Sequence, residues 1–189
     1  MSRKYKFVTD IPLHFVTYAT VGWIDIFSRE RYRTLVVDSL RHCCQQKGLQ
    51  LHAWVIMTNH VHLIMSTKDG VLPANILRDH KRFTSEAIHK DLLQFNGESR
   101  KEWMLPLFEQ AGKQNSANRG FQLWQQHNHP VWIGSLKVMQ QKLTYLHQNP
   151  VRAGFVDVAE QWRYSSARDY TGEPGLIPEL IFLEGRGNG

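Results

Sequence analysis

The chain has 189 residues, which is enough for one sizeable core and too short for two, so we expect a single domain over residues 1–189. Lysine and arginine outnumber aspartate and glutamate by 23 to 17, and the formal net charge is +6. Ten histidines can add positive charge beside an anion. This balance favours a polyanionic partner, with nucleic acid ahead of an anionic membrane surface.

Cysteine content and hydropathy narrow the class further. Cys43 and Cys44 are the only cysteines and are adjacent, which excludes a disulfide framework and a four-cysteine zinc site. Residues 1–15 carry basic side chains without the apolar core of a signal peptide, and no run reaches the ~18 apolar residues of a membrane span. We therefore expect a soluble, cytoplasmic protein with no membrane partner.

The first predicted elements are a strand and a helix. Residues 11–24 are β-branched and aromatic with rough period-two alternation, which predicts a strand ending near Gly22. Residues 29–47 carry apolar side chains at spacings of three and four before Gly48, which predicts an amphipathic helix.

A hairpin and a second helix follow. Residues 49–57 and 60–66 are apolar strands separated only by Thr58 and Asn59, as in a tight antiparallel hairpin. Pro73 begins a helix with two expected sides. The apolar side is expected to carry Ile76, Phe83 and Ala87, and the polar side Arg78, Arg82, Ser85 and His89, flanked by Lys81.

Residues 96–120 are polar and glycine-containing, and we interpret them as an insertion with a short helix at 102–111 and a mobile loop at 112–120. Residues 121–133 return to an extended, aromatic-rich chain.

The C-terminal part predicts one long helix. Ser135 is the expected N-cap of a helix that reaches Asn149, and Pro150 is expected to end it. A last short helix is expected within residues 165–170, followed by a tail at 171–189 with a frayed terminus.

The order of these elements predicts the fold class. Strand, helix, strand, strand, helix, strand, helix indicates an α+β protein in which an antiparallel β-sheet has helices packed on one face, a ferredoxin-like arrangement. Sheets of this kind also serve proteins that bind nucleic acids.

A pair of histidines opens the second strand of the hairpin. Side chains alternate along a strand, so His60 and His62 project to the same side as Ile64. Imidazole is a common metal ligand, but two nitrogens complete no coordination sphere, so a metal site needs a third donor from elsewhere. The alternative is a pair of ordinary strand histidines that donate hydrogen bonds.

A second pair lies on the predicted C-terminal helix. Tyr145 and Asn149 are four residues apart and therefore share a helix face. A tyrosine there can be a nucleophile and an asparagine an oxygen donor to a metal. The alternatives are a core tyrosine and an asparagine that belongs to an Asn-Pro stop signal.

A family resemblance rests on the segments "NHVHLI" and "YLHQNPVRAGFV", followed by "WRYSSARDY". With "HKRFTSEAI" and "WQQHNHPVWI" in the same order, they resemble the single-tyrosine transposases of the HUH endonuclease superfamily, most closely the REP-associated tyrosine transposases. The resemblance spans nearly the whole chain, and the insertion at 96–120 looks long for this branch.

The resemblance implies a role for each matching residue. His60 and His62 correspond to the metal ligands, Tyr145 to the catalytic nucleophile, and Asn149 to the polar residue that completes the metal site, with Gln148 as the fallback donor. The implied activity is metal-dependent cleavage and strand transfer of DNA, through a 5′-phosphotyrosine and a free 3′-hydroxyl. Mg²⁺ or Mn²⁺ suits such a site, although imidazole ligation alone would also suit Zn²⁺.

The implied substrate is single-stranded or hairpin DNA, and the protein is expected to be a monomer or a homodimer. The expected phosphate contacts are basic side chains at Arg3, Lys4, Lys6, Arg78, Lys81, Arg82 and Lys142. Unpaired bases can stack on aromatic side chains, for which the candidates are Trp124, Trp132, Trp162 and Tyr164, although core packing is an alternative use of these rings.

Two rival functions share these features. One is a non-catalytic binder of RNA or single-stranded DNA, in which the histidines are structural. The other is a metal hydrolase in which the metal activates water. Both predict that replacing Tyr145 by Phe preserves activity and that no covalent protein–DNA adduct forms.

Overall fold

A computed structural model describes residues 12–115, 120–126, 128 and 130–183. Its four strands form one antiparallel sheet in the order β2-β3-β1-β4. The strands are β1 (His14–Ala19), β2 (Leu49–Ile56), β3 (His60–Thr67) and β4 (Val131–Trp132). The α-helices are α1 (Glu30–Gln46), α2 (Pro73–Gln94), α3 (Lys101–Lys113), α4 (Leu136–His147) and α5 (Asn149–Arg152). The predicted α+β class with a ferredoxin-like antiparallel sheet is confirmed.

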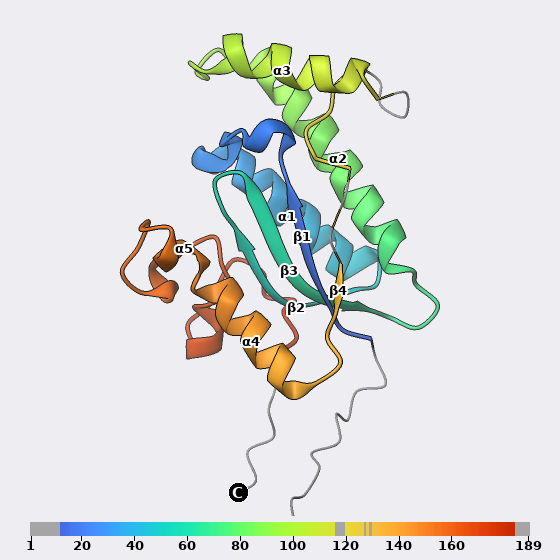
Figure 1. Cartoon of the computed structure of the whole chain (residues 1–189), viewed down its shortest axis with the longest axis vertical. Coiled ribbons are helices and arrows are strands. Elements are labelled where there is room, and N and C mark those ends of the chain that lie inside the picture. Colours follow the sequence, from blue (N-terminus) through green and yellow to red (C-terminus); the bar gives the residue numbers. More distant parts are fainter. Residues whose placement is uncertain (1–11, 116–119, 127, 129, 184–189) are drawn as a thin grey trace, which may run out of the picture.

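Helices cover both faces of this sheet (Figure 1). On one face α1 and α2 pack over Tyr18, Trp54 and Leu63. On the other face α4 packs over a smaller core that includes Phe15 and Ile64. We expected helices on one face; the second face is covered only in part, and this partial cover leaves room for a site beside α4.

The hairpin between β2 and β3 is as tight as predicted. Thr58 and Asn59 make the turn, and the Met57 amide donates to the His60 carbonyl at 2.8 Å. A β-bulge after Leu51 shifts the register of β2. The bulged residue His52 bonds through its ring nitrogens to Ser66 and to the Ile181 carbonyl.

The predicted apolar side of α2 is wrong in part. Phe83 is 53% exposed and Ala87 is half-buried. The face that packs on the core instead carries two polar side chains, His80 and Thr84, along with apolar ones. Hydropathy places polar residues outside, and here internal hydrogen bonds make their burial possible.

The C-terminal part departs from the prediction in three places. Ser135 is the N-cap of helix α4, as expected, and its hydroxyl accepts from the Val138 amide, but the helix ends at His147. Pro150 ends no helix, because it lies in the first turn of α5. The short helix expected within residues 165–170 is absent, and a 3-10 turn at Asp169–Thr171 overlaps only the end of that range.

The described part of the tail packs against the sheet. The Ile181 amide donates to the Leu51 carbonyl at 2.9 Å, and Ile177 is buried. The mobile loop was expected over 112–120, but residues 112–113 belong to α3, and residues 116–119 and 184–189 lie outside the described residues. Within the described residues no helix is both long and apolar enough to cross a membrane.

His80 joins α2 to the rest of the core. Its Nε2 lies 2.8 Å from the Tyr18 hydroxyl of β1, and its Nδ1 lies 2.9 Å from the Ser39 hydroxyl of α1. Burial lowers the pKa of the imidazole to about 3, and the nearby Lys81 charge acts in the same direction. The neutral ring is therefore the form that the fold requires.

We expect His80 to make stability fall in acid. The pKa of an unfolded histidine is about 6.5, so the contribution of neutral His80 is complete above that pH and is lost as pH falls toward 3. His80→Gln should destabilise the protein at pH 7, and this penalty should shrink by on the order of 2 kcal/mol at pH 4.5. Urea midpoints at both pH values measure it, and an equal penalty at both would contradict the assignment.

Candidate active site

The site begins with the histidine pair on β3. His60 and His62 point, with Ile64, to the sheet face that α4 covers, as the strand alternation predicted. Their ring centroids are 4.8 Å apart and the rings are nearly perpendicular, at 73°. The pair therefore converges on one region above the sheet.

Each imidazole is oriented by a hydrogen bond to its Nδ1. The Thr17 hydroxyl lies 2.7 Å from Nδ1 of His62, directly across the β1–β3 pairing. The side-chain oxygen of Asn59 lies 2.7 Å from Nδ1 of His60. Because an amide oxygen only accepts, the hydrogen of His60 is on Nδ1 and its Nε2 keeps a free lone pair.

Burial keeps both rings neutral. It lowers the pKa of His60 to about 4. For His62, burial first, and then the charges of His60 and Lys142, lower the pKa to about 3. Neutral imidazoles are the form that binds metals and accepts hydrogen bonds.

Tyr145 and Asn149 reach the same region from the C-terminal helices. The Tyr145 ring lies 5.4 Å from the His62 ring, edge to face, and the side chain is 39% exposed. The Asn149 side-chain nitrogen lies 3.0 Å from Nε2 of His62. An amide nitrogen donates, so His62 also carries its hydrogen on Nδ1 and donates it to Thr17.

The single helix predicted for Tyr145 and Asn149 is wrong, because α4 ends between them. Gln148 nevertheless keeps helical backbone angles, and its amide donates to the Thr144 carbonyl at 2.9 Å. The chain therefore turns as a helix would, and the two side chains stay one turn apart. Asn149 is the amide that contacts His62, whereas Gln148 was the fallback.

The donor chemistry of this group suits a divalent metal. Among the described residues no three His, Cys, Asp or Glu side chains are placed to hold a metal ion. A third ligand for the histidine pair must therefore be of another kind. Rotation of the Asn149 amide by a half turn would bring its oxygen to the position of its nitrogen beside Nε2 of His62.

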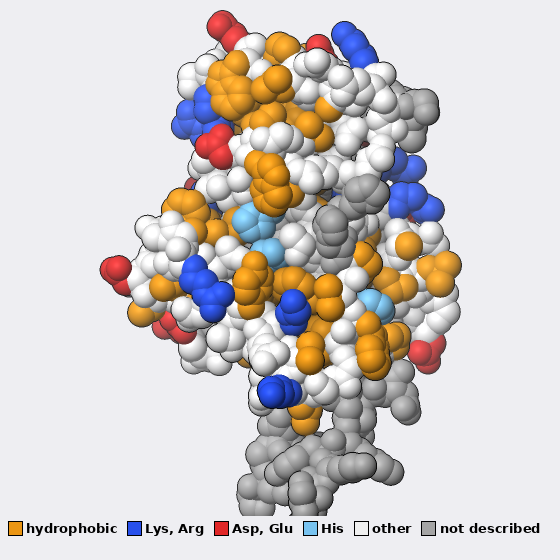
Figure 2. Space-filling view, viewed as in Figure 1, with side chains coloured by type: hydrophobic (Ala, Val, Ile, Leu, Met, Phe, Trp, Pro, Cys, Tyr) orange, Lys and Arg blue, Asp and Glu red, His pale blue; other side chains and the backbone are white. Residues whose placement is uncertain are grey.

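Positive charge surrounds the tyrosine. The Lys142 ammonium lies 4.7 Å from the centre of the Phe15 ring and 6.0 Å from that of Tyr145. The Arg152 guanidinium lies 5.6 Å from the Tyr145 ring. Figure 2 shows histidine, hydrophobic and basic side chains gathered on this face, with acidic ones mostly toward its edges. Such a face can attract a phosphate.

The basic residues of α2 border a different hollow. A groove of about 980 Å³ lies between α2 and residues 121–126, and Arg78 and Arg82 line it with exposed side chains. Both also lie within 4 Å of the Asp79 carboxylate. The predicted basic arm of Arg3, Lys4 and Lys6 lies outside the described residues.

Lys81 turns inward rather than toward solvent. Its ammonium donates to the Gln125 carbonyl and to the Asn128 side-chain oxygen, both at 2.7 Å. Burial lowers its pKa to about 8. Lys81 thus fastens the 121–128 segment to α2, and this bonding competes with the phosphate contact that we predicted for it.

Most of the predicted base-stacking residues are used in packing. Trp124 and Tyr164 are buried in the core. Trp162 is partly buried, donates to the Ile56 carbonyl and stacks on Phe155. Only Trp132, 66% exposed on β4, remains open among these four candidates.

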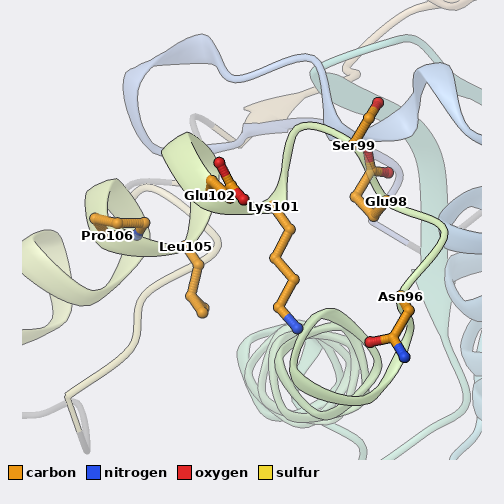
Figure 3. A pocket seen from close by; sticks show the side chains of 7 residues that line it. All are labelled: Asn96, Glu98, Ser99, Lys101, Glu102, Leu105 and Pro106. Carbon is orange, nitrogen blue, oxygen red and sulfur yellow. The ribbon is translucent and has the colours of Figure 1, made fainter.

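Residues of the insertion line a hollow of their own beside α2 (Figure 3). Lys101 extends from α3 to the end of α2 and donates to the Leu93 carbonyl at 2.9 Å. The buried Glu98 carboxylate bonds to Arg100, and Arg29 lies 3.7 Å away. These contacts explain how α3 is held, and the hollow contains none of the predicted site residues.

Sequence reasoning missed several residues of the site. Thr17 could be identified only from the β1–β3 register, and Asn59 was interpreted as a turn residue alone. Arg152 lies within the segment YLHQNPVRAGFV on which the family resemblance rests, so the sequence offered a reason to consider it. Phe15, which stacks on His62 with centroids 5.3 Å apart, gave only a core signal.

A ferredoxin-like sheet that sets two histidines against a tyrosine from a following helix is the arrangement that the resemblance implied for a transposase of the tyrosine class. The chain belongs to the IS200-like transposase family, whose sequence pattern matches residues 8–105. That match includes the histidine pair and ends before Tyr145. The family resemblance seen in the sequence is confirmed.

Two known proteins are similar along most of the chain. A Haemophilus influenzae protein described as a REP-associated tyrosine transposase is 26% identical over 145 residues, covering 75% of this chain and 72% of its own. The structure of a REP-associated tyrosine transposase bound to a REP hairpin superposes with a TM-score of 0.62 at 16% identity. It covers 100% of this chain and 99% of its own, and at that identity it supports the fold.

We expect Lys81 and Arg82 to differ in their effect on stability. Lys81→Ala removes two hydrogen bonds to a charged donor and should lower the free energy of unfolding by about 1–2 kcal/mol. Arg82→Ala is the matched control and should change it by less than about 0.5 kcal/mol, because its side chain is 68% exposed. Chemical denaturation measures both, and equal effects would contradict the structural role of Lys81.

Proposed function

We propose that this transposase cuts single-stranded DNA beside a hairpin, with Tyr145 as the nucleophile. The observation that carries the proposal is the convergence of Tyr145 and Asn149 on His62, which brings a phenol and an amide from the C-terminal helices to the histidine pair. A tyrosine in the core would be buried, whereas this ring is open to a strand of DNA.

The reaction is a transesterification. The Tyr145 oxygen attacks phosphorus, a new oxygen–phosphorus bond forms, and the bond from phosphorus to the 3′-oxygen breaks. The phenol gives up its proton to solvent, and the departing 3′-oxygen takes one up. The products are a 5′-phosphotyrosine and a free 3′-hydroxyl. Since the ester bond is kept, a 3′-hydroxyl can reverse the step and rejoin DNA without ATP.

His60, His62 and Asn149 would hold a divalent cation, Mg²⁺ or Mn²⁺, through two imidazole nitrogens and one amide oxygen. When bound, such an ion polarises the scissile phosphate and offsets negative charge as the 3′-oxygen departs. Thr17 and Asn59 orient the imidazoles so that both Nε2 atoms are free of hydrogen. Lys142 and Arg152 attract the phosphate and neutralise its oxygens.

The DNA partner follows from the basic surfaces and from the relatives. The structural neighbour is bound to a REP hairpin, and we propose a hairpin of that kind for this chain. Its phosphates would contact Arg78 and Arg82 along the α2 groove, with Arg3, Lys4 and Lys6 as a further arm. Tyr145, Asn149 and the histidine pair converge within one chain, so we propose that each chain, whether monomer or part of a homodimer, completes its own site.

Tyr145→Phe should abolish the covalent adduct and keep DNA binding. The substitution removes only the attacking oxygen. The probe is a set of labelled hairpin oligonucleotides that covers any palindromic sequences found beside the gene, incubated with Mn²⁺ and run on a denaturing gel. Tyr32→Phe is the matched control, because it removes a buried tyrosine hydroxyl from the opposite core. Cleavage by Tyr145→Phe without an adduct would support a metal hydrolase instead, and an adduct with Tyr145→Phe would show that another side chain is the nucleophile.

Thr17→Val should weaken Mn²⁺ binding by about 10–100-fold, because the His62 ring loses the partner that fixes its orientation. Asn149→Ala should weaken it similarly by removing a ligand. Free Mn²⁺ measured by electron paramagnetic resonance gives the affinity without reference to activity. Thr34→Val, on the exposed side of α1, is the control. Wild-type affinity in both Thr17→Val and Asn149→Ala would rule out this metal site.

A further inference from the structure

Trp23 has an unusual backbone conformation at the edge of the site. It follows Gly22 in the 3-10 turn after β1 (Val21–Trp23), and the two residues have φ angles of 61° and 56°. Trp23 is the only non-glycine residue with a positive φ in the described part of the chain. A bulky side chain disfavours this left-handed region, so the turn is strained at Trp23.

Hydrogen bonds hold the strained turn in place. The Thr20 hydroxyl lies 2.8 Å from the Ile24 carbonyl and 3.1 Å from that of Asn59. The Trp23 amide donates to the Thr20 carbonyl, and the Asn59 side-chain nitrogen donates to the Trp23 carbonyl at 3.2 Å. Asn59 thus fixes Trp23 with its nitrogen while it orients His60 with its oxygen.

The turn presents the indole to solvent next to the histidines. Trp23 is 57% exposed, and its ring lies 6.0 Å from that of His60 at 73°. From Trp23 through His60 and His62 to Tyr145, successive ring centroids are 6.0, 4.8 and 5.4 Å apart. Core packing does not account for a tryptophan that is held in a strained conformation and left more than half exposed.

We propose that Trp23 is a stacking platform for one unpaired base of the DNA strand beside the scissile phosphate. Every nucleobase has a flat face that stacks on an indole, so the platform needs no particular sequence. The ligand class is single-stranded DNA, since bases in a duplex are already stacked. Only the position of the stacked base relative to the cut rests on the proposed function; the stacking itself does not.

The place along the strand follows from in-line displacement. The attacking oxygen and the departing oxygen lie on opposite sides of phosphorus. Tyr145 and Trp23 lie at opposite ends of the series of rings, with the histidines between them. Trp23 therefore holds the nucleotide on the 5′ side of the cut, which carries the new 3′-hydroxyl. Stacking keeps that hydroxyl close to the phosphotyrosine for rejoining.

The binding test uses a fluorescent twelve-residue oligo(dT) in the Tyr145→Phe background, so cleavage plays no part. Trp23→Ala should weaken binding at least fivefold, and Trp23→Phe less than threefold, because a phenyl ring still stacks. The slope of the logarithm of the affinity against the logarithm of the salt concentration should stay unchanged, since no phosphate contact is lost. Trp103→Ala, an exposed tryptophan on α3, is the matched control. Equal affinity of Trp23→Ala and its parent would overturn the platform.

A second variant separates binding from folding. Trp23→Gly suits a φ of 56° and should melt at a temperature equal to or above that of Trp23→Ala, while it binds oligo(dT) as weakly. Trp23→Gly that melts well below Trp23→Ala would show that the indole serves packing, contrary to the proposal.

Cross-linking tests the position along the strand. A hairpin oligonucleotide with 5-iodo-deoxyuridine on the 5′ side of the mapped cut should cross-link to Trp23, and one with it on the 3′ side should not. The reverse result would overturn the assigned position. If no cut or adduct forms while Trp23→Ala still weakens oligo(dT) binding, the proposed function fails and the platform stands. If the adduct forms and oligo(dT) binding is unaffected, the platform alone fails.

Discussion

The pairing of β1 with β3 is the constraint on which the rest of the site depends. Its register sets Thr17 opposite His62 and Ala19 opposite His60. A shift by one residue would turn the Thr17 side chain to the other sheet face, so His62 would lose its hydrogen-bond partner. The hydrogen bond at 2.7 Å between Thr17 and Nδ1 of His62 decides which nitrogen faces Asn149. The β1–β3 pairing thus determines that Nε2 of His62 points toward Asn149.

The two sheet faces have different uses. The face under α1 and α2 is a closed core, in which even His80 is fully bonded and neutral. The face under α4 is only partly covered, and its buried apolar residues support Tyr145 and the histidines from below. Phe15 contacts both His62 and Tyr145, so one core side chain fixes the spacing between strand and helix. The closed core thus keeps the sheet rigid, while the partly covered face under α4 leaves room for DNA.

Local patterns in the sequence predicted the local parts of this structure. Alternation along β3 placed His60 and His62 on one face, Thr58 and Asn59 marked the hairpin, and Ser135 marked the start of α4. These features depend on neighbours within a few residues. The helix that contains Tyr145 was predicted too long, because the Asn-Pro step starts a new turn rather than ending an old one.

Contacts between distant residues were beyond the reach of such patterns. Hydropathy placed Phe83 inside, but Phe83 is exposed and the core side of α2 instead carries His80, because Tyr18 and Ser39 satisfy the buried imidazole. The exposure of Trp23 likewise depends on hydrogen bonds made by Thr20 and Asn59. The partner of His62 comes from the β1–β3 register, which no single strand encodes. The sequence therefore predicted which residues form the candidate site but not the hydrogen bonds that orient them.

Peptide mapping of the protein–DNA adduct tests most directly whether Tyr145 forms the covalent bond to DNA. After nuclease and trypsin digestion, mass spectrometry should find the tryptic peptide Leu143–Arg152 with a nucleotide joined to Tyr145 through its 5′-phosphate. A nucleotide on any other residue, or one joined through a 3′-phosphate, would contradict the account.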